Sequence, residues 1–154
     1  GQGSMYHHFS GKQELAVEAI KRTSEELVSR MKLIISEEKS AIDKIKAYLL
    51  YKREVLKGCR IGRLTQNPDI ISNEELREPV GEALEQIINI IAGIIEEGKK
   101  NNEFDEKINS HAVATTVLAV LQGGYVLARG ENSTAVFDEA ISGAIAMLES
   151  FSKN

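Results

Sequence analysis

Residues 2–15 hold the side chains whose types and spacing could recognise another molecule. Short or planar hydrogen-bonding groups without net charge fall on one face of a short predicted helix: Gln2, Ser4, Tyr6 and His7. Met5 and Phe9 are four residues apart and share the other, apolar face. Uncharged donors and acceptors suit base edges and phosphate oxygens, so this helix is typical of one that enters a groove of DNA.

A longer helix is predicted to begin at Ser10, because Ser10 and Gln13 have the spacing of a capping box. Lys12 then lies in the first turn, beside free backbone N–H groups, where a phosphate would be stabilised. The adjacent pair His7 and His8 is interpreted as solvent-exposed, since neighbouring helical positions diverge by about 100° and only residues three or four apart meet. We therefore expect no metal site.

Apolar residues recur at intervals of three and four along the rest of the chain, which is the helical period. This pattern predicts helices over residues 10–35, 41–57, 74–100, 108–128 and 134–152. Ser40 and the pair Ser72 and Glu75 supply capping signals for the second and third helices, and Gly58 is a stop signal for the second. No stretch alternates convincingly between apolar and polar residues, so the predicted fold class is all-α, with residues 59–72 as a connection containing about one helical turn.

Two of these helices lack a charged face, because residues 108–128 and 140–148 contain no Asp, Glu, Lys or Arg. Such helices must be covered by protein on several sides. We expect a second copy to supply the cover, so that residues 108–128 and 134–152 of two chains form a four-helix bundle in a homodimer. The alternative is a thick core within one chain. A membrane span is not favoured, because polar residues and paired glycines dilute the 108–128 helix.

Length and composition restrict the classes of protein to consider. The chain has 154 residues, with 19 Lys and Arg against 23 Asp and Glu, which suits one domain or one domain and a small piece. The net charge of −4 argues against binding nucleic acid by bulk charge but leaves room for a small local contact surface. A single cysteine excludes an internal disulfide framework and a cysteine-based zinc site. With no signal peptide, the cytoplasm is the expected location.

The stretch from Gly3 to Leu15, GSMYHHFSGKQEL, resembles the motif around the recognition helix of the TetR family of transcriptional regulators. The shared features are a glycine, a small hydroxyl residue, the aromatic spacing, and the lysine and leucine that follow. The resemblance implies that residues 1–35 are the remnant of a helix-turn-helix domain plus a connecting helix, and residues 36–154 a helical ligand-binding and dimerisation domain. Residues 58–64, GCRIGRL, are similar to a segment of one carboxy-terminal subgroup, the YxaF/LmrA-like regulators.

The resemblance also implies roles for single residues. Those implied to contact DNA are Gln2, Ser4 and His7 in the major groove, Gly3 where the backbone approaches DNA, and Tyr6 and Lys12 at phosphates. Family members carry two further helices before the position of Gly1, so we interpret the chain as a fragment, a processed product or a trimmed protein. We expect the full-length protein to bind operator DNA, and residues 1–154 alone to bind it weakly or not at all.

The resemblance also implies a ligand-controlled switch with a cavity among the central helices. Four polar residues are candidates for binding an effector in that cavity: Tyr48, Lys52, Gln122 and Tyr125. Each has a plainer interpretation. Lys52 could lay its stem over the core, the two tyrosines could be core aromatics, and Gln122 could form a hydrogen bond across the dimer. Cys59 is interpreted as a small apolar group rather than a redox sensor.

The implied function is a ligand-responsive regulator, a repressor released from its operator by a small molecule, without a cofactor. The effector would favour one tilt of the 10–35 helix and so change the separation of two recognition helices in a dimer. An all-α enzyme is not favoured, because no nucleophile–base pair, paired carboxylates or metal-ligand spacing is present. A small-molecule carrier or a structural helical dimer without DNA binding remains the alternative, but it leaves the Tyr6-to-Leu15 pattern unexplained.

Overall fold

The computed structural model describes residues 11–153 of the chain, and within them the fold is all-α, as predicted. In chain order the helices are α2 (Lys12–Ser36), α3 (Ala41–Leu50), the 3₁₀ turn η1 (Val55–Lys57), α4 (Arg60–Leu64), α5 (Pro68–Ile71), α6 (Glu74–Lys100), α7 (Ser110–Glu131) and α8 (Ala135–Ser150). The predicted DNA contacts Gln2, Gly3, Ser4, Tyr6 and His7, together with the predicted helix start at Ser10, lie outside the described residues.

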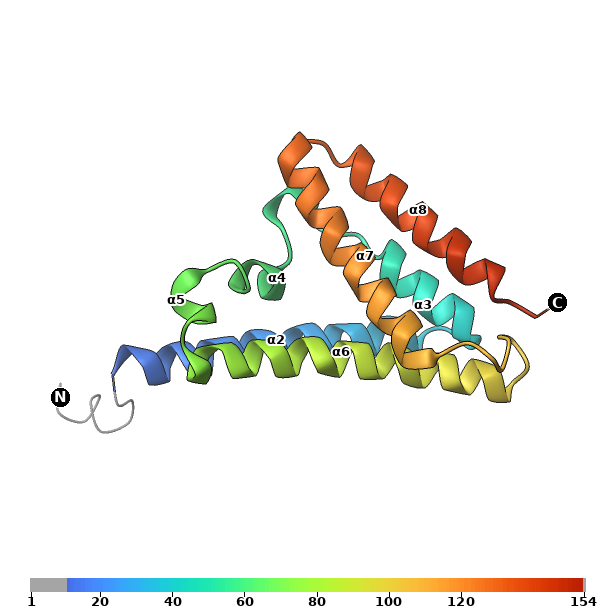
Figure 1. Cartoon of the computed structure of the whole chain (residues 1–154), viewed down its shortest axis with the longest axis horizontal. Coiled ribbons are helices and arrows are strands. Elements are labelled where there is room, and N and C mark those ends of the chain that lie inside the picture. Colours follow the sequence, from blue (N-terminus) through green and yellow to red (C-terminus); the bar gives the residue numbers. More distant parts are fainter. Residues whose placement is uncertain (1–10, 154) are drawn as a thin grey trace.

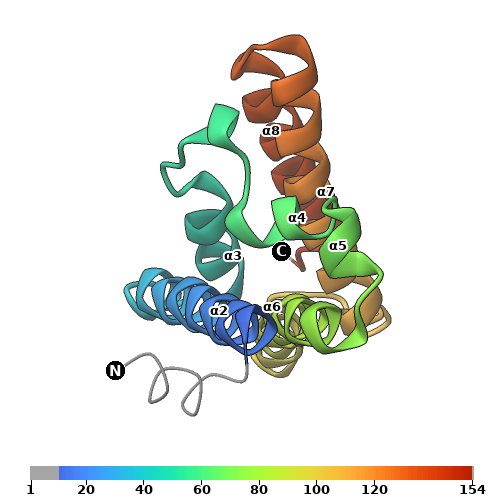
Figure 2. The ribbon, with the colours of Figure 1, turned by 90° about the vertical axis from the view of Figure 1, so that its left-hand side faces the viewer.

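The two longest helices, α2 and α6, run side by side and in the same direction along one side of the molecule (Figures 1 and 2). Helices α3, α7 and α8 stand over the carboxyl-terminal half of this pair, and α7 packs against both α6 and α8. The short helices α4 and α5 lie over its amino-terminal half. The base formed by α2 and α6 therefore joins the two halves of the molecule.

Local side-chain chemistry explains where most of the helices begin. The Ser40 hydroxyl accepts a hydrogen bond from the Asp43 backbone N–H at 3.1 Å, which confirms the predicted cap of α3. Helix α6 spans the predicted residues, but the predicted Ser72–Glu75 capping box is wrong. Asn73 caps α6 instead, because its side-chain oxygen accepts from the Glu75 N–H at 3.1 Å.

The predicted helix over residues 41–57 is wrong in its second half, since α3 ends at Leu50. The Arg53 guanidinium donates hydrogen bonds to the backbone carbonyl oxygens of Tyr48 at 2.6 Å and Leu49 at 3.1 Å, which satisfies groups that a longer helix would have used. The chain bends over residues 51–54, and Gly58 ends the 3₁₀ turn with a φ of 79°. Residues 59–72 form two short helices rather than one turn.

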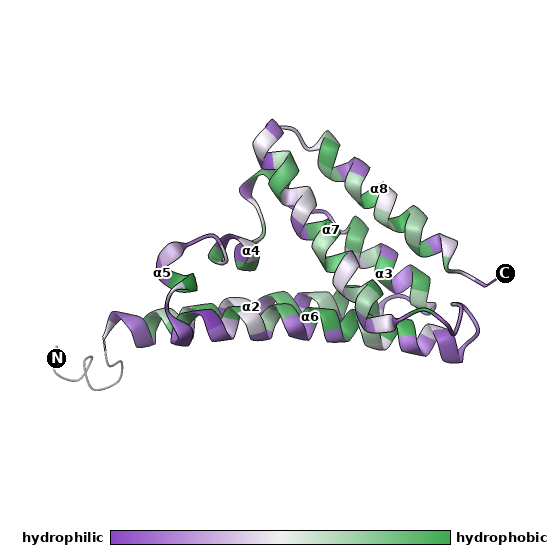
Figure 3. Ribbon diagram, in the orientation of Figure 1, coloured by the Kyte–Doolittle hydropathy of each residue, from purple (hydrophilic) through white to green (hydrophobic). Residues whose placement is uncertain are grey.

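The buried side chains form two separate clusters. The larger lies among α2, α3, α6, α7 and α8, and its most buried members include Met31, Ile45, Ile91, Leu121 and Leu148. The smaller joins the first half of α2 to α4 and α6 through Ile20, Ile61, Val80 and Ala83. Apolar residues accordingly follow the inward faces of the long helices, whereas polar residues follow their outer faces (Figure 3).

Backbone hydrogen bonds join the segment after α6 to the end of α8: the Lys153 N–H donates to the Glu103 carbonyl at 2.8 Å and the Asp105 N–H to the Phe151 carbonyl at 3.1 Å. Phe104 lies between Glu103 and Asp105 and is 1% exposed. The Glu103 carboxylate accepts from the Ala41 backbone N–H at 3.0 and 3.1 Å and so fixes the start of α3. Gly98 of α6 lies against Phe104 and Ala41, and a Cβ atom at Gly98 would be 2.6 Å from Phe104 Cδ2 and 2.8 Å from Ala41 Cβ. This corner has no room for a methyl group.

We predict that Gly98→Ala destabilises the protein by about 1–3 kcal/mol, because the added methyl group forces apart a packed core. Gly93→Ala in the same helix is the matched control, since a Cβ at Gly93 meets no atom within 4 Å. That control should be more stable by about 0.5–1 kcal/mol through helix propensity. Urea unfolding followed by circular dichroism measures both changes, and equal stabilities for the two variants would contradict the packing described.

Candidate ligand-binding site

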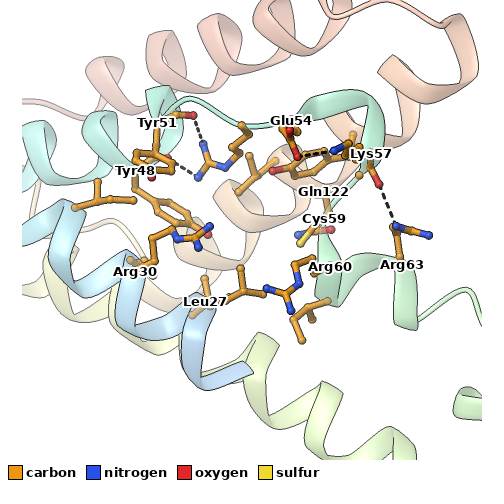
Figure 4. A pocket seen from close by; sticks show the side chains of 18 of the residues that line it. Leu27, Arg30, Tyr48, Tyr51, Glu54, Lys57, Cys59, Arg60, Arg63 and Gln122 are labelled. Carbon is orange, nitrogen blue, oxygen red and sulfur yellow. Dashed lines mark hydrogen bonds and ion pairs between the residues drawn. The ribbon is translucent and has the colours of Figure 1, made fainter. Parts of the chain in front are cut away.

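A cavity of about 460 Å³ lies at the junction of the two hydrophobic clusters. Its walls come from α2, the end of α3, the 51–59 segment, α4, α6 and α7 (Figure 4). The volume lies within the range of small-molecule pockets, about 300–1,000 Å³. Residues of the larger cluster line one side of the cavity and residues of the smaller cluster line the other. The space between the two clusters is left unfilled.

The interior of the cavity is apolar. The side chains that form it come from both clusters and from three long helices: Leu27, Met31 and Ile34 of α2, Leu84 and Ile87 of α6, Leu121 of α7, and Ile61 of the short α4. Met31, Ile61 and Leu121 are 1–2% exposed. Such a surface favours an apolar ligand body.

The remaining lining is strongly cationic. Six basic side chains line the cavity, against one carboxylate, that of Glu54: Arg30, Lys52, Arg53, Lys57, Arg60 and Arg63. The whole chain carries a net charge of −4, so the cavity concentrates charge of the opposite sign. A local cationic site in an acidic protein attracts anions.

Arg53 shapes the cavity wall as well as contributing charge. Besides its hydrogen bonds to the end of α3, it donates to the Tyr51 carbonyl at 3.0 Å. Its guanidinium also lies over the rings of Tyr48 and Tyr51, 4.9 and 5.8 Å from their centroids. These contacts hold the bend after α3 against the cavity, and Figure 4 shows the bonds to Tyr48 and Tyr51.

Two tyrosines contribute neutral phenols. Burial raises the pKa of Tyr125 to about 12, despite the opposing effect of the Arg53 charge. Burial also raises the pKa of Tyr48, although Arg53 acts against it. The Tyr125 ring packs on Phe137 with centroids 5.0 Å apart. Both phenols therefore stay protonated near neutral pH.

Gln122 and Tyr125 of α7 bring polar groups to the cavity without hydrogen bonds of their own among residues 11–153. Tyr125 is 8% exposed overall, and its hydroxyl keeps some access to solvent, because the described residues include no fully buried side-chain oxygen or nitrogen without a partner. A ligand that reached either group would satisfy it. This is the arrangement expected where a few polar groups orient a mostly apolar molecule.

The glycines of the 58–64 segment permit close approach of α7. A Cβ at Gly58 would lie 2.8 Å from Arg129 Nη1, and one at Gly62 would overlap the Gln122 side-chain oxygen. Gly58 also has a positive φ, which residues with a side chain rarely adopt. Cys59, half-buried and free, is the N-cap residue of α4 and lines the cavity.

The structure brings all four predicted effector contacts to this one cavity: Tyr48, Lys52, Gln122 and Tyr125. Lys52 lies in the bend after α3, although the helix predicted over residues 41–57 would have included it. Sequence reasoning missed the other five basic residues. Arg60 and Arg63, three residues apart, gave a usable signal, whereas Arg30 gave none without knowledge of which helix faces α4.

Of the predicted DNA contacts, only Lys12 falls in the described part of the chain. It is the first residue of α2, after the N-cap Gly11, and it is exposed. Within residues 11–153 no three His, Cys, Asp or Glu side chains are grouped so as to hold a metal ion. Helix α7 is long and apolar enough to cross a bilayer by length and composition alone, a test that a core helix also passes.

The fold and the cavity place this chain among all-α domains that enclose a small-molecule-sized cavity between long helices. Residues 39–144 match the family described as tetracyclin repressor-like, C-terminal domain. The match covers more than half of the chain, and the chain therefore belongs to this family. The predicted TetR family membership is confirmed, and the narrower subgroup stays a prediction.

One curated relative is the fatty acid metabolism regulator protein of Bacillus subtilis (strain 168). It is 28% identical over 108 residues, which are 70% of this chain and 56% of that protein. The matched segment thus spans little more than half of the relative's length.

Similar solved structures include a TetR-family transcriptional regulator from Cytophaga hutchinsonii, with 18% identity and a TM-score of 0.88 over 99% of this chain and 78% of that one. A TetR regulator from Chloroflexus aurantiacus J-10-FL has 22% identity and a TM-score of 0.84 over 96% of this chain and 77% of that one. FadR from Bacillus subtilis, in complex with stearoyl-CoA, has 20% identity and a TM-score of 0.72 over 97% and 81%. These likenesses show the fold.

Proposed function

We propose that this chain is the effector-binding and dimerisation part of a cytoplasmic, ligand-responsive transcriptional regulator, a repressor released from its operator by a small molecule. The observation that carries the proposal is that α2 forms one wall of the cavity, through Leu27, Arg30, Met31 and Ile34. The same helix begins at Lys12, beside the residues proposed to contact DNA. Occupation of the cavity therefore acts on the helix that leads to the DNA-binding end.

Family membership supports a regulator over an enzyme or a carrier. We retain residues 1–35 as the DNA-binding remnant with its connecting helix and residues 36–154 as the effector domain. The proposed DNA contacts are unchanged and require the full-length protein: Gln2, Gly3, Ser4, Tyr6, His7 and Lys12. No cofactor enters the proposal.

Arg60 of α4 connects the cavity to α2. Its Nη1 donates to Glu26 Oε2 at 3.0 Å and its Nη2 to Thr23 Oγ1 at 3.3 Å. Both partners in the ion pair are about half exposed, so the pair is worth only about 0–1 kcal/mol. A contact this weak can be exchanged for one with a ligand, which makes Arg60 suited to reporting occupancy to α2.

A second contact joins the beginnings of α2 and α6. Gln13 donates to Glu75 Oε2 at 2.6 Å and accepts from Asn73 Nδ2 at 2.8 Å. Asn73 is also the N-cap of α6, so the first turns of both helices share one hydrogen-bonded group. This junction ties the first turn of α2, next to Lys12, to the first turn of α6.

The proposed switch needs only a modest free energy. Recognition helices of a dimer bind half-sites about 34–36 Å apart, so a small change in their separation weakens contacts at both. An effector whose binding free energies to the two tilts of α2 differ by about 1–3 kcal/mol would change operator occupancy markedly.

We propose that the outer faces of α7 and α8 form the dimer interface, within residues 108–128 and 134–152. On α7, exposed small or apolar residues recur at helical spacing from Ala112 to Leu127, and Val126 and Leu127 are 56% and 50% exposed. On α8, Met147 is 61% exposed. Exposed apolar groups on two adjacent helices favour association with an identical pair.

In the full-length protein, we predict that Arg60→Gln and Glu26→Gln each weaken operator binding without ligand by up to about fivefold, the equivalent of a lost exposed ion pair. Lys57→Gln is the control, because Lys57 also lines the cavity but pairs with Glu54 and not with α2. Fluorescence anisotropy with operator DNA measures the change. Unaltered operator affinity in both variants would refute the coupling, and failure of the full-length protein to select any DNA sequence would refute the function.

We predict that Leu127→Glu converts the dimer into a monomer, because it places a charge in the proposed apolar interface. Leu33→Glu on α2 is the control, since Leu33 is 70% exposed but lies away from α7 and α8. Sedimentation equilibrium at micromolar concentration determines the mass. A wild-type monomer, or a variant that stays dimeric, would show that the interface lies elsewhere.

A further inference from the structure

We propose that the effector is an anionic amphiphile: a molecule with an apolar body and a carboxylate or phosphate head. This inference rests on the proposed function, because it assigns a ligand class to the same cavity. It comes from the charge of the cavity and from the way that its polar groups are paired.

The charge of the lining selects against neutral and cationic ligands. Six Lys and Arg side chains against one Glu leave a large cationic excess around a cavity with an apolar interior. The sole lining carboxylate, Glu54, already pairs with Lys57 at 3.1 Å. A cationic ligand would meet repulsion without a free carboxylate in the lining to offset it, whereas an anion would relieve the repulsion among the basic groups.

Two of the basic residues are available to hold an anionic head. Arg53 and Arg63 donate to backbone carbonyl oxygens, Lys57 pairs with Glu54, and Arg60 donates to Glu26 and Thr23, so an anion would have to displace an existing contact at each of them. Arg30 and Lys52 make no hydrogen bond or ion pair within residues 11–153. Both residues line the same cavity and both are exposed, so we place the head at the rim of the cavity, against Arg30 and Lys52.

The position of Arg30 suits this role. Figure 4 shows its side chain beside Tyr48, on the α2 side of the cavity and across from Cys59 and Gln122. The apolar body would then extend from Arg30 over Leu27 and Met31 toward α7. There the neutral side chains of Gln122 and Tyr125 can accommodate it without placing a negative charge near the ligand, since the pKa of Tyr125 is raised to about 12.

The test is isothermal titration of the whole chain with four probes that share a twelve-carbon chain: dodecanoate, dodecyl phosphate, dodecanol and dodecylammonium. The charged probes are kept below their micelle-forming concentrations and dodecanol below its solubility limit. We expect at least one anion to bind about tenfold or more tightly than dodecanol, and dodecylammonium to bind most weakly. The tighter of the two anions identifies the head group. Equal binding of anions and dodecanol, or preference for the ammonium, would overturn the proposal.

Substitutions locate the head. Arg30→Gln and Lys52→Gln should each reduce affinity for the preferred anion about tenfold and leave dodecanol binding unchanged. Arg22→Gln and Lys21→Gln, exposed on α2 and outside the cavity lining, are matched controls that should change neither. An equal loss of anion affinity in all four variants would show that the overall charge decides binding and not the position of Arg30 and Lys52. That result would overturn the assignment.

Operator release by the full-length protein separates this inference from the proposed function. If an anion binds as expected but the operator is not released, the ligand class stands and the regulatory function fails. If dodecanol or dodecylammonium binds more tightly than either anion and releases the operator, the regulatory function stands and the ligand class fails.

Discussion

The packing of α2 along α6 is the contact on which the rest of the structure depends. Only three of the 25 residues of α2 are buried, Ile20 in the smaller cluster and Val28 and Met31 in the larger. The helix is thus held at two places, and the cavity opens beside the segment from Leu27 to Ile34. A ligand there lies at one of the two attachments of a long helix whose remaining residues are exposed or only partly buried, so that a small displacement is carried along its length.

The chemistry of the cavity follows from the same division into two clusters. Apolar residues from both clusters form its interior, and the segment that connects them, residues 51–63, brings most of the basic residues. That segment leaves the helical path because Arg53 satisfies the carbonyl groups at the end of α3. One arginine thereby ends a helix, positions two tyrosines and adds charge to the site.

Much of the fold could be predicted from the sequence, because long helices carry their apolar period over many turns. The bounds of α6 and the cap of α3 followed directly from that period and from Ser40. The end of α3 could not be predicted, since Ile42, Ile45, Leu49 and Leu56 continue the period while the hydrogen bonds of Arg53 end the helix. Leu56 is in fact 44% exposed. The cap at Asn73 was missed because Ser72 offers the same chemistry one residue earlier.

The candidate site was predicted only in part, for a related reason. Tyr48, Gln122 and Tyr125 are polar groups on apolar helices, which single them out in the sequence. Nothing in the sequence sets Arg30 apart from the other charged residues of α2, and it becomes a cavity residue only through the placement of α4 over α2. Long-range packing of this kind leaves no periodic signal.

The most direct test of the account is the distance between the two copies of α2 in the full-length dimer. Spin labels at Arg22→Cys, in a Cys59→Ser background, report this distance by pulsed electron paramagnetic resonance. Saturation with the anionic probe that binds most tightly should shift the distance distribution by several ångströms, and operator affinity should fall with it. A distribution that stays unchanged while the same ligand releases the operator would contradict it.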